Sequence, residues 1–253
     1  MFNIKKFFSA TVGTICLLAC CSLPTKAYEK IKCDCIFSVG SACRPAQYLR
    51  KYKLRSQAAP LDWMMNFSLP TALHIIENKG QDFFEECKDT GETVGNCRVV
   101  RDTKNGITSI HHFSKKLSLQ NAKKEFRNTM IDRAKKVDRM LKESDSIAFI
   151  ANRQKDSLEN FKTFIKGVDK LYPNKKITLI NIYDTNDKKV KEKVLFNEKN
   201  LKIIEYRFDD ASPDPKKYPS WQGNPFGWKE VIDHVKLSDK FVNKNTDFTK
   251  VGF

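Results

Sequence analysis

The chain has 253 residues, and its 46 lysines and arginines against 30 acidic residues give a net charge of +16. This charge favours anionic partners, such as phosphate-bearing glycans and lipid headgroups. Specific nucleic-acid binding is not expected, because the lysines are spread along the chain and neither a zinc-finger spacing nor an RNA-binding signature is present.

Residues 1–27 have the pattern of a secretory signal peptide. A basic head precedes an apolar run over residues 7–21, and Ala27 stands at a cleavage position. The run is shorter than the roughly 18 to 20 residues that span a bilayer. We therefore predict an exported protein, periplasmic or secreted, with one α/β domain over residues 28–253. A lipobox-like sequence ending at Cys20 is the alternative, and it would tether the protein to a membrane through that lipidated cysteine.

Cysteine counting predicts disulfides and one free thiol. Cleavage leaves an odd number of cysteines, namely Cys33, Cys35, Cys43, Cys87 and Cys97. The first two stand two apart on a predicted strand and would face the same side, which is a poor geometry for a bond between them. We predict that Cys33 or Cys35 pairs with Cys87 or Cys97, which leaves Cys43 free. A bond between Cys87 and Cys97 is the rival. No metal site is expected, because partner ligands at the usual spacing are missing.

Strands and helices alternate along most of the chain. Periodicity predicts strands at 33–39, 106–113, 146–151, 176–183 and 201–208, and helices at 118–143 and 156–171. Residues 80–106 indicate loops with a hairpin, and the lysine-rich residues 184–200 indicate a solvated excursion. This order is typical of a mainly parallel sheet with helices on both faces, a Rossmann-like layered α/β fold. A papain-like α+β arrangement is the alternative.

The stretch CDCIFSVGSACRPAQYLRKYKLR, residues 33–55, places Cys43 in a turn from a strand into a helix. Such turns lie at the crevice where α/β sheets bind ligands. The helix N-terminus and Arg44 are expected to lower the pKa of the thiol. Gly40 permits a sharp turn, and Pro45 suits a first helical turn. Together these features favour a reactive thiol over a buried inert one.

A cysteine nucleophile needs a base, and the chain offers four histidines: His74, His111, His112 and His234. The adjacent pair lies on a predicted strand and must point to opposite faces, so at most one of the two reaches Cys43. Strict alternation places Ile107 and Phe113 on the face of His111, but periodicity alone does not choose between the two histidines.

Weaker signals come from four other places. Asp62 precedes Trp63 and would orient an imidazole as the third member of a triad, or cap the short helix that follows. His74 lies in an apolar run and is interpreted as structural, and His234 is a weaker alternative base. Residues 219–228 carry two tryptophans and indicate a packed loop over the sheet edge, with a sugar-stacking wall as the alternative.

Three blocks in this order resemble a bacterial family described as papain-like cysteine peptidases of unknown function. The blocks are SVGSAC at 38–43, PLDWM at 60–64 and HHF at 111–113, and a long basic helix follows them. The family pattern runs Gly-Ser-x-Cys, Asp-Trp and His-x-Phe, and the resemblance spans about residues 36–183.

The resemblance implies Cys43 as the nucleophile, His111 as its base and Asp62 as a motif carboxylate whose role the pattern leaves open. This chain has His112 where the family usually has an aspartate, so the choice between the two histidines stays open. The family label also implies a papain-like fold, whereas the alternation after residue 146 favours a layered parallel sheet.

Three functions follow as alternatives. The first is an exported thiol hydrolase of the cysteine-peptidase type, in which Cys43 attacks the carbonyl of a peptide, amide or ester. The second is a non-catalytic exported protein that binds an anionic cell-envelope glycan or surface. The third is a glycan-modifying α/β enzyme that does not use the thiol. No cofactor is expected in any of them.

Overall fold

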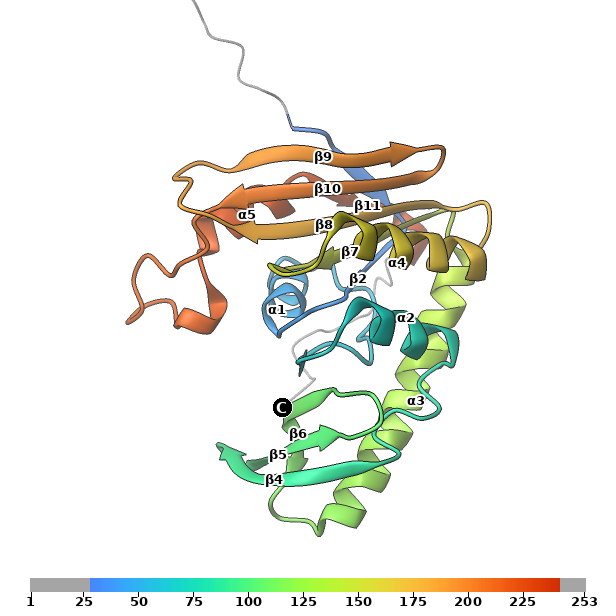
Figure 1. Cartoon of the computed structure of the whole chain (residues 1–253), viewed down its shortest axis with the longest axis vertical. Coiled ribbons are helices and arrows are strands. Elements are labelled where there is room, and N and C mark those ends of the chain that lie inside the picture. The colour runs from blue at the N-terminus through green and yellow to red at the C-terminus, as the bar shows by residue number, and fades with distance from the viewer. Residues whose placement is uncertain (1–27, 242–253) are drawn as a thin grey trace, which may run out of the picture.

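The computed structural model describes residues 28–241, which form five α-helices and three β-sheets (Figure 1). The predicted signal peptide and the lipobox cysteine Cys20 lie outside the described residues. The described chain has a mixed α/β fold, so the predicted α/β class is confirmed at that level.

The largest sheet has five strands in the order β2-β7-β8-β10-β9. Their bounds are Cys35–Ser38 for β2, Ser146–Ala151 for β7, Lys176–Asp184 for β8, Leu201–Phe208 for β10 and Lys191–Glu198 for β9. The first four strands run parallel, and β9 is antiparallel to β10. Almost every residue of β7 and β10 is buried or half-buried, because both faces of the sheet are covered.

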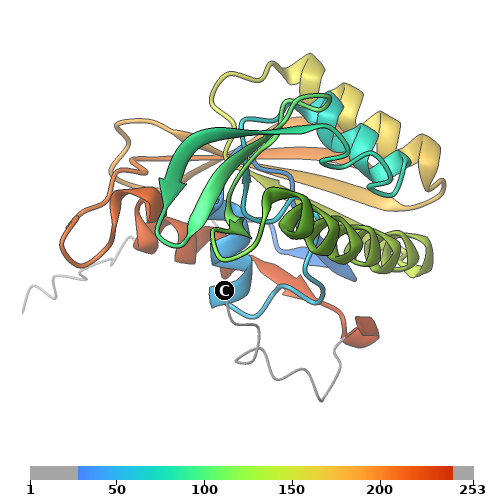
Figure 2. The same ribbon diagram turned by 90° about the horizontal axis from the view of Figure 1, so that it is seen from below.

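Helices cover both faces of this sheet. The helices α1 (Arg44–Lys51) and α5 (Pro225–Ile232) share one apolar cluster with one face of the sheet. The other face packs with α2 (Leu69–Glu77), α3 (Leu119–Glu143) and α4 (Leu158–Leu171). In Figure 2, α2 and α4 lie side by side and the long α3 crosses below them.

A second sheet is antiparallel and corrects the predicted mainly parallel layout. It has the order β3-β6-β5-β4, with bounds Met64–Met65 for β3, Thr108–Ser114 for β6, Cys97–Asp102 for β5 and Cys87–Val94 for β4. The predicted hairpin within 80–106 and the predicted strand at 106–113 pair with each other and not with the parallel strands. Figure 1 shows this sheet beside α3, apart from the five-stranded sheet. This layout is consistent with the papain-like α+β alternative.

The predicted strand at 33–39 is split at Asp34. Before it, β1 (Ile31–Cys33) pairs with β11 (Val235–Leu237), whereas β2 pairs with β7. The carboxylate of Asp34 accepts hydrogen bonds from the backbone N–H groups of Asp145 and Ser146 at 2.7 and 3.0 Å. These bonds add to the backbone hydrogen bond from Asp34 N–H to the carbonyl of Ser146 at 2.8 Å and hold the chain at the break. Local apolar pattern does not reveal such a partner, because it lies more than a hundred positions away in the sequence.

The predicted disulfides are wrong for this structure, because the five cysteines of the described residues are free thiols. The break at Asp34 places Cys33 and Cys35 in different apolar clusters, not on the same side as predicted. Burial raises the pKa of both thiols to about 12, so they are inert packing residues. Cys87 and Cys97 lie at opposite ends of the β4–β5 hairpin, which also excludes the rival bond.

The lysine-rich residues 184–200 contain β9 and are not only a solvated excursion. Most residues of β9 are exposed, and the strand forms the outer edge of the sheet. Lysines on an edge strand keep it in water and discourage pairing with other chains. A charged sequence is therefore compatible with a strand at this position.

Candidate active site

Cys43 lies in the turn that connects β2 of the five-stranded sheet to α1. It follows the carboxyl end of the parallel strand β2 and is the N-cap residue of α1, and its side chain makes no capping hydrogen bond. Gly40 opens the turn with φ +72°, and a Cβ at this position would lie 2.4 Å from Cζ of Phe67. Only glycine fits there without a shift of the aromatic ring. The predicted strand-turn-helix placement of Cys43 therefore agrees with the structure.

The expected lowering of the Cys43 pKa is wrong for the resting structure. The side chain is buried, and this burial raises the pKa of the thiol, opposed only by a hydrogen bond from its own backbone N–H. Arg44 does not face the thiol. Its guanidinium pairs with Asp210 and donates to the carbonyl oxygens of Ser220 and Trp221 at 3.0 and 2.9 Å. The positive charge expected beside the sulfur is thus engaged elsewhere.

The two adjacent histidines lie in an irregular part of β6. Between two cross-strand pairs that join β5 to β6, β6 has three intervening residues, 110–112, where β5 has only Val99. Such a bulge re-aims side chains and breaks the alternation of faces. The alternation that placed Ile107 and Phe113 on the face of His111 therefore does not hold here.

The surroundings of the two rings differ. His111 lies edge-on to Trp63, with ring centroids 6.1 Å apart. His112 packs against Phe126 at 5.3 Å, and its Nδ1 is hydrogen-bonded to Ser109 Oγ at 2.9 Å. Burial lowers the pKa of His111, and burial together with neighbouring positive charge lowers the pKa of His112 to about 3. A ring with so low a pKa is a poor acceptor for a thiol proton, so the electrostatics favour His111 as a base.

Asp62 holds the turn that carries Trp63. Its Oδ2 accepts hydrogen bonds from the backbone N–H of Ala59 at 3.0 Å and from Arg55 Nη1 at 3.4 Å. The carboxylate is fully buried, which raises its pKa, and the charge of Arg55 is the main factor that opposes this rise. Among the described residues, no hydrogen bond joins Asp62 to a histidine ring. Nor does it cap a helix, because Ser68 is the N-cap of α2.

The segment 62–67 joins the cysteine turn to the histidine strand. Trp63 contacts the ring of His111, and Phe67 at the other end closes on Gly40. Both halves of the candidate site therefore pack on one short segment that contains the Asp-Trp motif. No hydrogen bond within residues 28–241 links the thiol directly to either histidine of β6.

Arg153 is a further site residue that the sequence pattern did not single out. Its Nε and Nη2 donate to the carbonyl oxygen of Val39 at 3.0 and 2.9 Å, and Nη2 also donates to the carbonyl of Phe67 at 3.0 Å. Nη1 forms an ion pair with Asp156 at 3.1 Å. The available signal was an arginine two residues after the apolar strand at 146–151, because a charge that is buried there must find several partners.

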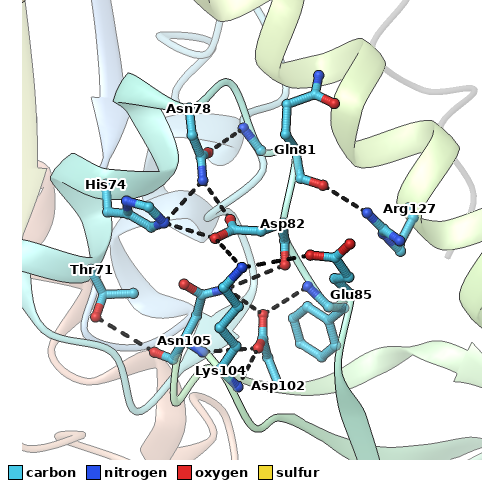
Figure 3. A network of polar contacts seen from close by, with 12 residues as sticks. Thr71, His74, Asn78, Gln81, Asp82, Glu85, Asp102, Lys104, Asn105 and Arg127 are labelled. Atoms are coloured by element: carbon cyan, nitrogen blue, oxygen red, sulfur yellow. Dashed lines mark hydrogen bonds and ion pairs between the residues drawn. The ribbon is translucent and has the colours of Figure 1, made fainter.

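A second polar network surrounds Asp82, and Figure 3 shows its members converging from α2 and the loop after it, from the loop after β5 and from α3. His74 Nε2 lies 2.8 Å from the carboxylate, and Lys104 Nζ lies 3.3 Å from it. Although burial alone would raise the pKa of Asp82, hydrogen bonds from His74, Asn78 and Lys104 lower it. The network fixes two loops to each other, which agrees with the structural interpretation of His74.

Residues 219–228 are partly packed and partly exposed. Trp228 is completely buried, stacks on Tyr48 with centroids 4.7 Å apart and donates from Nε1 to Asp210 at 2.9 Å. Trp221, in contrast, is 47% exposed. One tryptophan thus belongs to the core, as a packed loop predicts, and the other to the surface. His234, the weaker alternative base, lies edge-on to Tyr28, with ring centroids 4.9 Å apart.

Residues 28–241 lack two other kinds of feature. No group of three or more histidine, cysteine, aspartate or glutamate side chains in this range is arranged to hold a metal ion. No helix in the same range combines the length and apolar character that crossing a membrane requires.

Comparison with known proteins places these features in a family. A family model described as "Putative papain-like cysteine peptidase" matches residues 34–202, which include Cys43, Asp62 and His111. An uncharacterised protein of Acanthamoeba polyphaga mimivirus is 24% identical over 225 residues, which cover 79% of this chain and 97% of the viral protein. No solved structure matches. The chain belongs to the family that is described as "Putative papain-like cysteine peptidase".

Proposed function

We propose that the protein is a thiol hydrolase of the cysteine-peptidase type, with Cys43 as the nucleophile and a peptide, amide or ester as the substrate. The observation that carries the proposal is the place of Cys43 in a chain of this family: it stands between the carboxyl end of a parallel strand and the start of a helix. That is the position at which α/β sheets present reactive groups.

In the proposed mechanism, His111 takes the thiol proton at the moment of attack. The raised pKa of Cys43 keeps the resting thiol protonated, and the lowered pKa of His111 keeps its imidazole neutral and able to accept. The sulfur bonds to the carbonyl carbon, and the carbonyl electron pair moves onto oxygen. The carbonyl then re-forms as the bond to the leaving group breaks, and the imidazolium protonates that group. A water activated by His111 hydrolyses the thioester, which releases the acid and restores the thiol.

The first turn of α1 offers donors for the oxyanion. Gln47 N–H already bonds to the carbonyl of Cys43 at 3.0 Å, whereas helix geometry leaves the N–H groups of Arg44 and Ala46 without intrahelical acceptors. Pro45 between them has no N–H to lose. These two N–H groups are the proposed oxyanion donors, and they act together with the partial positive charge of the helix N-terminus.

We propose that Asp62 and Arg153 position the site and take no part in the chemistry. Asp62 holds the turn that presents Trp63 to His111, and Arg153 holds the end of β2. Export of the protein, through residues 1–27 as a signal peptide or through lipidation of Cys20, is proposed from the sequence pattern. A single domain over residues 28–253 and a preference for anionic substrates are proposed on the same basis.

A non-catalytic protein that binds an anionic glycan or surface is the second candidate. Two observations favour it: the thiol of Cys43 is buried with a raised pKa, and it shares no hydrogen bond with a histidine among the described residues. In this case Cys43 is a packing residue, and the basic surface of the protein carries the function.

Hydrolysis assays on wild type, Cys43→Ala and Cys87→Ala separate the two candidates. The substrates are a fluorogenic peptide mixture and p-nitrophenyl esters. A hydrolase loses about a hundredfold or more of its rate in Cys43→Ala and none in Cys87→Ala, whose thiol is free and half-buried. Equal rates in wild type and Cys43→Ala contradict the proposal. If wild type hydrolyses neither substrate class, the hydrolase proposal is wrong and the non-catalytic binding protein becomes the favoured function.

A further inference from the structure

A cavity of about 200 Å³ lies between α3 and the irregular part of β6. Its polar lining comes from His112 and Ser114 of β6 and from Glu125, Thr129 and Arg133 of α3. It is smaller than the roughly 300 to 1,000 Å³ pockets that hold drug-sized ligands. The cavity therefore suits a small ion or one acidic side chain, and no residue of the Cys43 turn lines it.

Arg133 is the cation of this cavity, and its guanidinium lacks an oxygen acceptor among the described residues. Its one hydrogen bond there is to Met130 Sδ at 4.0 Å, and a thioether is a weak acceptor. Asp62 lies close enough for its charge to act on Arg133, yet no ion pair joins the two, and the hydrogen bonds of the carboxylate come from elsewhere. A fork of N–H donors therefore remains for a ligand.

The charges around Arg133 do not balance. Arg55 and Arg133 share the single carboxylate of Asp62, and burial is the main reason why the pKa of Arg133 is lowered. His112 adds no charge near neutral pH, because its pKa is about 3. One positive charge is thus left partly desolvated, which costs free energy until an anion offsets it.

We propose that this cavity binds an oxyanion, a carboxylate or a phosphate, with Arg133 as its bidentate ligand. Ser114 and His112 add neutral hydrogen-bonding groups, and His112 does so through Nε2, because Nδ1 is engaged by Ser109. Glu125 is the acidic residue of the lining, is exposed, and repels anions of high charge. The site does not depend on the chemistry of Cys43.

Calorimetric titration of the full chain with inorganic phosphate and, separately, with acetate tests the proposal. The variants are Arg133→Gln and Arg133→Lys, and the control is Arg139→Gln, because Arg139 lies on the same helix with a side chain 71% exposed. Arg133→Gln is expected to weaken binding about tenfold or more. Arg133→Lys keeps the charge but loses the fork and falls in between. Arg139→Gln stays within about twofold of wild type.

Phosphate binding without acetate binding identifies a phosphate site, and the reverse identifies a carboxylate site; either result supports the proposal. Equal losses in Arg133→Gln and Arg139→Gln show only a general attraction to a basic protein and overturn it. Absence of binding of both anions to wild type overturns it as well. If Arg133→Gln does not fold by circular dichroism, Ser114→Ala decides: an affinity about two- to fivefold below wild type supports the site, and an unchanged affinity overturns it.

Discussion

Arg153 holds the carbonyl oxygen of Val39 through two nitrogens, Nε at 3.0 Å and Nη2 at 2.9 Å. Val39 ends the extended chain just before the turn that carries Cys43, and the same arginine bonds to the carbonyl of Phe67, whose ring closes on Gly40. One side chain from the end of β7 thus ties β2 to the segment that contains the Asp-Trp motif. The position of the cysteine turn therefore depends on a buried cation outside every recognised motif.

Arg153→Lys is expected to lower the free energy of unfolding by about 2 to 4 kcal/mol, because lysine cannot satisfy three acceptors in the geometry of the guanidinium fork. Urea unfolding of this variant and of Arg139→Lys, an exposed arginine changed in the same way, measures the difference. Cys43 should also react faster with iodoacetamide as its turn loosens. If the free energy of unfolding of Arg153→Lys lies within about 0.5 kcal/mol of wild type, the bonds of Arg153 do not hold β2 and the segment 62–67 together.

Gly40→Ala is expected to destabilise the protein by about 2 to 4 kcal/mol, because a Cβ 2.4 Å from Phe67 Cζ forces the ring to move. Gly91→Ala is the matched control: Gly91 also has a positive φ, but nothing lies within 4 Å of its Cβ position. Backbone strain alone costs about 1 kcal/mol there. Equal losses of unfolding free energy in the two variants would mean that the contact with Phe67 does not matter.

The free energy of unfolding should decrease as the pH is lowered below about 6.5, because of His112. Its pKa is about 3 in the folded protein and near 6.5 when unfolded, so the unfolded chain binds a proton that the folded chain does not. This contribution is complete above pH 6.5 and is lost as the pH falls towards 3, at up to about 1.4 kcal/mol per pH unit. Urea midpoints at pH 7.0 and 5.5 measure the effect.

In the same measurement, His112→Gln should show a smaller loss between the two pH values than wild type does. His234→Gln is the control for the loss of a histidine elsewhere, because its ring packs beside Tyr28 in the cluster on the other face of the five-stranded sheet. Identical pH dependence of wild type and His112→Gln would contradict the assignment of a neutral, buried His112.

The thiol of Cys43 should titrate above its ordinary pKa of 9.0, because burial disfavours the thiolate. The pH profile of its iodoacetamide alkylation, followed by mass spectrometry of the peptide that contains Cys43, gives the midpoint. Cys43→Ser identifies the signal among the five free thiols of the described chain. A midpoint below about 8 would reveal an activating charge beside the sulfur and would rule out proton transfer at the moment of attack.

Local pattern predicted the elements whose periodicity is long or whose strands are wholly buried. The helix with apolar residues from Ala122 to Leu141 and the strands β7, β8 and β10 agree closely with the prediction, because three or more turns or a continuous apolar run define each one. That β3, β4, β5 and β6 form a separate antiparallel sheet did not follow from pattern, because local periodicity does not say which strands pair.

Site features with a local sequence signal were predicted, and those set by distant residues were not. Cys43 was placed correctly because Gly40 and Pro45 mark a strand-to-helix turn locally. The partner of Arg44 was not foreseen, because Asp210 is distant in sequence and outcompetes the nearby thiol. Nor did the pattern reveal the irregularity in β6, because a bulge depends on the register of two strands and not on the residues of one.

The most direct test of the central claim is to trap an acyl group on Cys43 from a p-nitrophenyl ester at neutral pH and detect it by mass spectrometry. The acylation rate is compared among wild type, His111→Ala and His112→Ala. The account predicts a thioester at Cys43, a rate about a hundredfold lower in His111→Ala, and a rate within about threefold of wild type in His112→Ala. A chain that acquires no acyl group at Cys43, or that is slowed only by His112→Ala, would contradict it.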